Sequence, residues 1–200
     1  MAATLFVVSF GGSVRIPADT SPADWIAPRL GEFGTVGGLV PAGFDGYVLV
    51  EHIPGDYDQD WDASRELVDQ IAALLGSNTS TPEAGWFAVW EGYGFFDVSD
   101  LSQVPKLDLP NRRYFLLTGA VAAAALLERP DPSRSRGFQP PDLWWPEDRS
   151  WFVATDTDLP WSYVGADEGV CGELARCFPD RTMTVPWEAW NGGLLRDLRR

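Results

Sequence analysis

The sequence is poor in the residue types that many enzymes use for catalysis. Lysine occurs once, as Lys106, and histidine occurs once, as His52, among 200 residues. A Schiff-base or phosphate-binding lysine therefore has a single available position. A nucleophile activated by histidine would depend on His52, and the chain has no G-x-S-x-G motif to supply that nucleophile. We therefore expect no catalytic residue, and a binding domain rather than an enzyme.

Cysteine is also scarce, with only Cys171 and Cys177 in the chain. Both fall within a helix predicted over residues 167–178, where a separation of six residues places their Cα atoms about 9 Å apart along the axis. A disulfide needs roughly 4.4–6.8 Å between these atoms. Two cysteines alone do not complete a zinc site. We expect two buried, reduced thiols, with no metal and no cofactor.

Long hydrophobic runs are absent. No stretch approaches the roughly 18 consecutive apolar residues that a membrane-spanning helix needs. The N-terminal apolar run Leu5–Val8 is short and lacks the charged segment and the cleavage site of a signal peptide. We therefore expect a cytoplasmic protein that makes no contact with a membrane.

Positive charge is scarce in the first half of the chain. The formal net charge is −14, and residues 17–100 carry 15 acidic residues against only Arg29 and Arg65. An acidic surface of this kind repels nucleic acid and anionic membranes and attracts basic partners. Solubility alone is the alternative explanation of the acidity. We expect no nucleic-acid binding, and a basic protein as the partner; the sequence leaves the oligomeric state open.

Aromatic residues, in contrast, are abundant, and the ten tryptophans gather in short phrases. In a strand predicted over residues 85–91, alternation places Trp86, Ala88 and Trp90 on one face. An alanine between two indoles leaves a slot that fits a planar or sugar ring. The alternative is that these indoles belong to an ordinary aromatic core.

Further residues are candidates to complete such a slot. Trp144 and Trp145 lie on a turn bounded by proline, from which they would close the slot, and Glu91, Asp156 and Asp158 would be its polar anchors. Asp156 and Asp158 directly follow a predicted strand, a spacing that suits a Mg²⁺ site. The same pair also suits a strand end with Asx-turns, and we favour that interpretation.

The pattern of elements predicts an α+β fold. Strands are expected over residues 4–10, 47–53, 85–91, 113–118, 150–155 and 182–185. Helices are expected over residues 21–30, 64–75, 120–128 and 167–178. The elements mix without a regular βαβ order. We expect a single globular domain over residues 1–200, with a mixed or mainly antiparallel sheet, about four helices packed on it, and a long irregular loop at 129–142.

Three phrases resemble a family of uncharacterised actinobacterial proteins. They are Trp86–Gly94, Leu109–Gly119, and the stretch from Leu143–Pro146 through Trp151–Thr155 to Tyr163–Gly165. The family has no known activity, so the resemblance implies no catalytic residue. A looser resemblance, through Leu39–Val50, is to the SMI1/KNR4-type immunity superfamily.

Two functional hypotheses follow. The first is a non-enzymatic cytosolic interaction domain, whose acidic first half binds a basic protein. The alternative is a small-ligand-binding protein or enzyme that uses the tryptophan-lined cleft.

Overall fold

The structure is a computed structural model that describes residues 14–52, 61–93, 105–110, 112–126 and 140–192. The strand expected over residues 4–10 lies outside these ranges. The aspartate-rich segment 54–60 and nearly all of the irregular loop expected at 129–142 also lie outside the described ranges.

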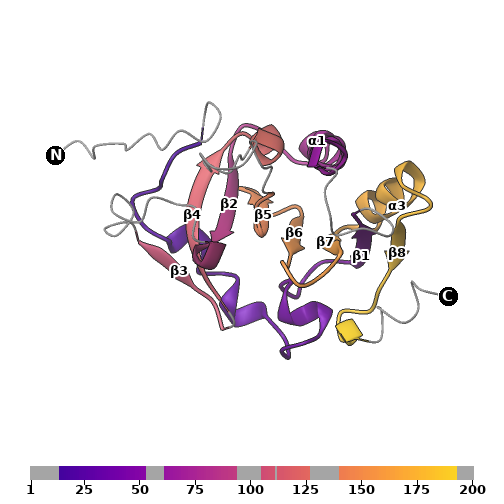
Figure 1. Ribbon diagram of the computed structural model, residues 1–200, viewed down its shortest axis with the longest axis horizontal. Helices are drawn as coiled ribbons and strands as arrows, with labels where there is room; N and C mark the ends of the chain where they lie inside the picture. Colours follow the sequence, from indigo (N-terminus) through magenta and orange to yellow (C-terminus); the bar gives the residue numbers. More distant parts are fainter. Residues whose placement is uncertain (1–13, 53–60, 94–104, 111, 127–139, 193–200) are drawn as a thin grey trace.

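The described residues form one eight-stranded sheet, in the order β3-β4-β2-β5-β6-β7-β1-β8 (Figure 1). Every pair of neighbouring strands is antiparallel. The strands are β1 (Gly46–Glu51), β2 (Gly85–Trp90), β3 (Lys106–Asp108), β4 (Arg113–Gly119), β5 (Leu143–Pro146), β6 (Phe152–Thr155), β7 (Trp161–Ala166) and β8 (Thr182–Thr184). The α+β class and the mainly antiparallel sheet are therefore confirmed.

Helical segments cover both faces of the sheet (Figure 1). One face carries α1 (Trp61–Ser77), α3 (Glu168–Cys177) and the 3-10 helix η5 (Val121–Leu126). The opposite face carries the 3-10 helices η1 (Ser21–Ala23), η2 (Ala27–Arg29) and η3 (Val36–Gly38). A further 3-10 turn, η4 (Glu91–Tyr93), follows β2 directly.

Each face of the sheet has its own hydrophobic core. Strand alternation sends Phe87 and Val89 of β2 to the core under α1, and Ala88 to the core under the 3-10 helices. Trp144 and Trp145 of β5 divide in the same way, one to each core. Because both faces are covered, central strands such as β7 are buried along their whole length.

Two of the four expected helices are α-helices. The helix expected over 64–75 is α1, and Leu67, Ile71 and Leu75 of its predicted inner face are buried. The helix expected over 167–178 is α3, which Asp167 caps by accepting a hydrogen bond from the backbone N–H of Val170 at 2.8 Å.

The other two expected α-helices are wrong within the described residues. Residues 21–30 form η1 and η2 and not an α-helix, because Pro28 has no N–H to donate to the carbonyl of Asp24 and its ring would clash with that carbonyl. Ile26 nevertheless lies in the core as expected. The described part of 120–128 is the 3-10 helix η5, a form that is common in short connectors.

Candidate functional site

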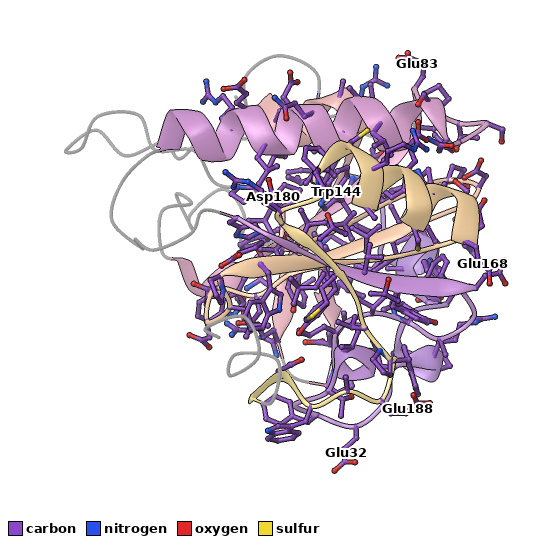
Figure 2. All side chains as sticks on the ribbon, turned by 90° about the vertical axis from the view of Figure 1, so that its right-hand side faces the viewer. Glu32, Glu83, Trp144, Glu168, Asp180 and Glu188 are labelled. Atoms are coloured by element: carbon purple, nitrogen blue, oxygen red, sulfur yellow. The ribbon has the colours of Figure 1, made fainter. Side chains whose placement is uncertain are left out.

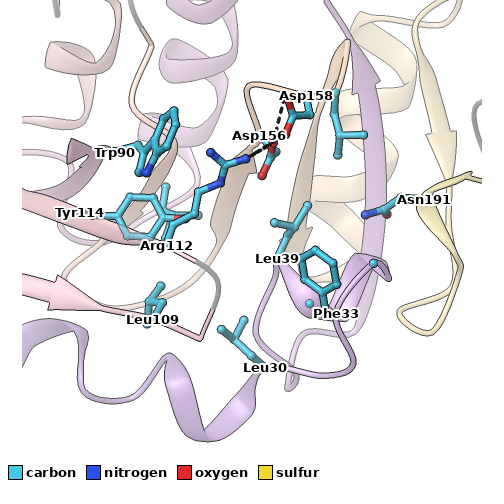
Figure 3. Close-up of a pocket in the computed structure, with 14 residues that line it drawn as sticks. Leu30, Phe33, Leu39, Trp90, Leu109, Arg112, Tyr114, Asp156, Asp158 and Asn191 are labelled. Atoms are coloured by element: carbon cyan, nitrogen blue, oxygen red, sulfur yellow. Dashed lines mark hydrogen bonds and ion pairs between the residues drawn. The ribbon is translucent and has the colours of Figure 1, made fainter. Parts of the chain in front are cut away.

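A pocket of about 330 Å³ lies on the 3-10 side of the sheet, where β2 and β6 end (Figure 3). Its apolar walls come from segments far apart in the sequence. They are Leu30, Phe33, Leu39, Leu109, Leu143 and Leu159. Trp90 and Tyr114, which are cross-strand partners in β2 and β4, also line it.

Arg112 extends from the β3–β4 connection across the pocket (Figure 3). Its Nη2 donates to Asp156 Oδ1 at 2.9 Å and to Asp158 Oδ2 at 3.1 Å. Its guanidinium carbon lies 4.5 Å from the centroid of the Trp90 ring, within cation–π distance. Burial lowers the pKa of Arg112, but the nearby charge of Asp156 and other groups outweighs burial and raises that pKa overall.

The two carboxylates differ in their surroundings. The side chain of Asp156 is 15% exposed, and its Oδ1 also accepts a hydrogen bond from the backbone N–H of Asp158 at 2.9 Å. The side chain of Asp158 is 83% exposed and stands at the rim. The hydrogen bond between the two residues is the Asx-turn expected at this strand end. Within the described ranges, no three His, Cys, Asp or Glu side chains gather as a metal site would require.

A third carboxylate lies behind the pocket. Asp142 is buried, and its Oδ2 accepts a hydrogen bond from the backbone N–H of Trp90 at 2.7 Å. Its own backbone joins two strands, because its N–H donates to Ala88 and its carbonyl accepts from Thr155. Trp90 is therefore held at the end of β2 while its ring remains half-buried.

The structure brings together Trp90, Asp156 and Asp158 of the expected site. Trp86 lies at the other end of β2, where its Nε1 donates to Glu147. Ala88 between the two indoles is fully buried, so protein atoms cover that part of the expected slot.

The remaining expected site residues do not line this pocket. Glu91 forms ion pairs with Lys106 at 2.5 Å and with Arg113 at 3.6 Å. Trp144 and Trp145 belong to a strand and not to the expected turn, and both are buried in the cores. Sequence reasoning missed Arg112, because Asp156 and Asp158 lie 44 and 46 residues further along the chain and no local pattern links them to it.

Two large hydrophobic side chains are exposed beside the pocket. Phe33, which lines the pocket, is 72% exposed, and Trp190 is 57% exposed. Gly34, which follows Phe33, packs against the Trp190 ring so closely that a Cβ at this position would lie 2.3 Å from that ring. Its φ of +86° is one that glycine adopts without strain. We call Phe33 and Trp190 the aromatic rim.

His52 lies at the end of β1, on the face opposite the pocket. Its Nε2 is 2.7 Å from Ser162 Oγ, which in turn is 2.6 Å from Thr155 Oγ1. Burial, with a smaller contribution from the charge of Arg181, lowers the pKa of His52 to about 4. The imidazole is therefore neutral at pH 7. Its hydrogen bond with Ser162, which in turn bonds to Thr155, links the ends of β1, β7 and β6.

The two cysteines lie on different sides of α3. Cys171 is buried, as expected, but Cys177 is exposed, so the prediction of two buried thiols is wrong for Cys177. Six residues on a helix rotate by roughly 120° from a shared face, which explains the difference. Both thiols are free.

In the part of the chain that the structure describes, no helix is both long and apolar enough to cross a membrane. Comparison of the chain with protein-family models, with curated proteins and with solved structures finds no match.

Proposed function

We propose that the protein is a non-enzymatic interaction domain, and that the aromatic rim and the adjoining pocket form its docking surface. The carrying observation is that Phe33 and Trp190, the most exposed large hydrophobic side chains of the described residues, both lie near the pocket, Phe33 in its lining and Trp190 against the neighbouring Gly34. Exposed aromatic side chains beside a pocket are typical of binding hot spots. Each such ring removes roughly 150–250 Å² from water when a partner covers it.

The charge around the aromatic rim favours a basic partner. Glu32 and Glu188 are exposed and lie close in sequence to Phe33 and Trp190 respectively. Figure 2 shows these two glutamates at the end of the molecule opposite α1. Asp158 adds a third exposed carboxylate at the pocket. An apolar centre with an acidic border attracts basic proteins, and this attraction weakens as salt rises.

Photo-crosslinking tests this proposal. Benzoylphenylalanine is placed at Phe33 or at Trp190, and the protein is irradiated in an extract of the cells that make it. The matched control carries the same group at Ala73, which is exposed on α1. We expect one dominant protein adduct at both rim positions, a lower yield at high salt, and no such adduct at Ala73. Equal adducts at all three positions would contradict the proposal.

The acidic border has its own control in the same assay. Replacement of Glu32 and Glu188 by glutamine keeps the aromatic rim but removes two negative charges. We expect this double variant to lose much of the adduct at low salt and to become less sensitive to salt, since Asp158 remains. An unchanged yield would show that the partner does not depend on charge.

A second candidate function is the binding of a small molecule in the pocket. The pocket volume of about 330 Å³ lies at the small end of the range typical of ligand sites. Its apolar walls with a few convergent polar groups are the observation that favours this candidate. A metabolite bound in the pocket would shift the signals of Trp90 without an adduct at either rim position.

A further inference from the structure

The polar side of the pocket carries an excess of negative charge. Asp156 and Asp158 line the pocket beside Arg112, whose guanidinium is the single positive charge among the residues that line it. Asp142 lies behind the pocket, close enough for its charge to act on Arg112. Two carboxylates in the pocket and a third behind it therefore lie near one cation. An anion that enters the pocket meets net repulsion, whereas a cation meets net attraction.

The carboxylates also retain acceptor capacity. Asp156 uses Oδ1 for Arg112 and for the backbone N–H of Asp158, and Asp158 uses Oδ2 for Arg112. Each carboxylate has a second oxygen, and no donor within the described residues bonds to either one. A carboxylate accepts several hydrogen bonds, so both groups are able to receive a further N–H.

The pocket walls suit an aliphatic stem. Leu39 lies between Phe33 at the rim and the carboxylates (Figure 3), and Leu159 also lines the pocket. A lysine or arginine side chain buries its methylene groups against such a surface and keeps its charge at the polar end. Trp90 adds an aromatic face, which attracts cations and which Arg112 now occupies.

We propose that the pocket receives one lysine or arginine side chain of a basic protein partner, with its stem against the leucines and its charge at Asp156 and Asp158. In the free protein, the guanidinium of Arg112 already occupies part of this position, because it bonds to the same two carboxylates. This inference rests on the proposed function and names the group of the partner that enters the pocket.

The test uses small probes of equal length in place of the partner. Hexylamine, hexan-1-ol and hexanoate are titrated into ¹⁵N-labelled protein, and the indole N–H signal of Trp90, assigned with Trp90→Phe, is followed by NMR. We expect hexylamine to shift this signal at the lowest concentration, hexan-1-ol to bind more weakly, and hexanoate to bind least. Equal binding of the amine and the alcohol overturns the proposal, and so does preferential binding of hexanoate.

Two substitutions give opposite expected results. Asp158→Asn removes one exposed carboxylate and should weaken hexylamine binding about threefold to fivefold. Arg112→Gln removes the competing cation and should strengthen it. Weaker amine binding by Arg112→Gln would identify Arg112 as the recognition group and would overturn the proposal.

Matched controls separate a local effect from a general one. Glu83→Gln removes an exposed carboxylate at the α1 end of the molecule, and it should leave hexylamine binding unchanged (Figure 2). A thermal melt of each variant shows that it is folded at the temperature of the titration. If the amine fails to bind while crosslinks at Phe33 and Trp190 persist, the cation site is wrong and the interaction domain stands.

Discussion

His52 makes the stability of this protein depend on pH in a predictable way. The folded-state pKa of His52 is about 4, against an ordinary value of 6.5 that we take for the unfolded chain. Because the pKa is lowered on folding, the unfolded chain binds the proton more tightly. The stabilisation is therefore complete above pH 6.5 and is lost as pH falls from 6.5 towards 4.

The magnitude follows from the two pKa values. At pH 5 the unfolded chain is mostly protonated at His52, while the folded protein is mostly neutral there. This difference lowers the free energy of unfolding by about 2 kcal/mol relative to pH 7.5. Since His52 is the only histidine in the chain, no other histidine titrates between these two values.

Urea denaturation followed by tryptophan fluorescence measures this loss at pH 7.5, 6.5, 5.5 and 5.0. His52→Gln is the control, because its amide still reaches Ser162 but does not titrate. Carboxylates that begin to titrate near pH 5 are present in both proteins and cancel in the comparison. We expect the wild type to lose about 2 kcal/mol more than His52→Gln over this range. Parallel pH profiles for the two proteins would refute the burial of a neutral His52.

Further predictions concern packing and thiol reactivity. Burial raises the pKa of the Cys171 thiol to about 11, whereas Cys177 is exposed. A thiol reagent at pH 8 should therefore label Cys177 within minutes and Cys171 only after unfolding. Equal labelling rates would contradict this. Trp145→Ala should cost about 3–5 kcal/mol of stability because this indole is buried. Trp190→Ala should cost under about 1 kcal/mol because Trp190 is exposed. Similar losses for the two variants on urea denaturation would be inconsistent with the burial of Trp145. Gly34→Ala should displace the Trp190 ring and cost about 1–3 kcal/mol of stability, because the φ of Gly34 is +86° and a Cβ there would lie 2.3 Å from that ring. Wild-type stability on urea denaturation would count against the described turn.

Strong local patterns made some elements predictable. The apolar runs in the strands predicted over 85–91 and 113–118, and the apolar spacing in the helix predicted over 64–75, correspond to β2, β4 and α1. The predicted strand 47–53 corresponds to β1 (Gly46–Glu51). The strands are apolar on both sides because helical segments cover both faces of the sheet, and α1 is apolar on the one side that packs against it.

Other elements depend on contacts that local patterns do not contain. β7 includes Ser162 and Gly165, which weaken a strand pattern. Gly165 is needed because the Phe44 ring packs against it, and a Cβ there would lie 2.6 Å from that ring. β5 ends in Pro146, so the sequence indicated a turn, although β2 and β6 both pair with this segment. These strands exist because neighbours on both sides supply their hydrogen bonds.

The pocket depends even more on distant contacts. Asp156 and Asp158 were identifiable as carboxylates after a strand, and Trp90 as an aromatic residue at the end of another. Arg112 joins them only because the sheet order places β4, β2, β5 and β6 side by side, so that one arginine side chain reaches from the β3–β4 connection to the β6–β7 turn. A sheet in which β6 lay next to β3 would place the same residues without this pocket. The topology of the sheet therefore turns three separate sequence signals into one negatively charged, apolar-walled pocket, and the amine titration measures the chemical consequence of that topology.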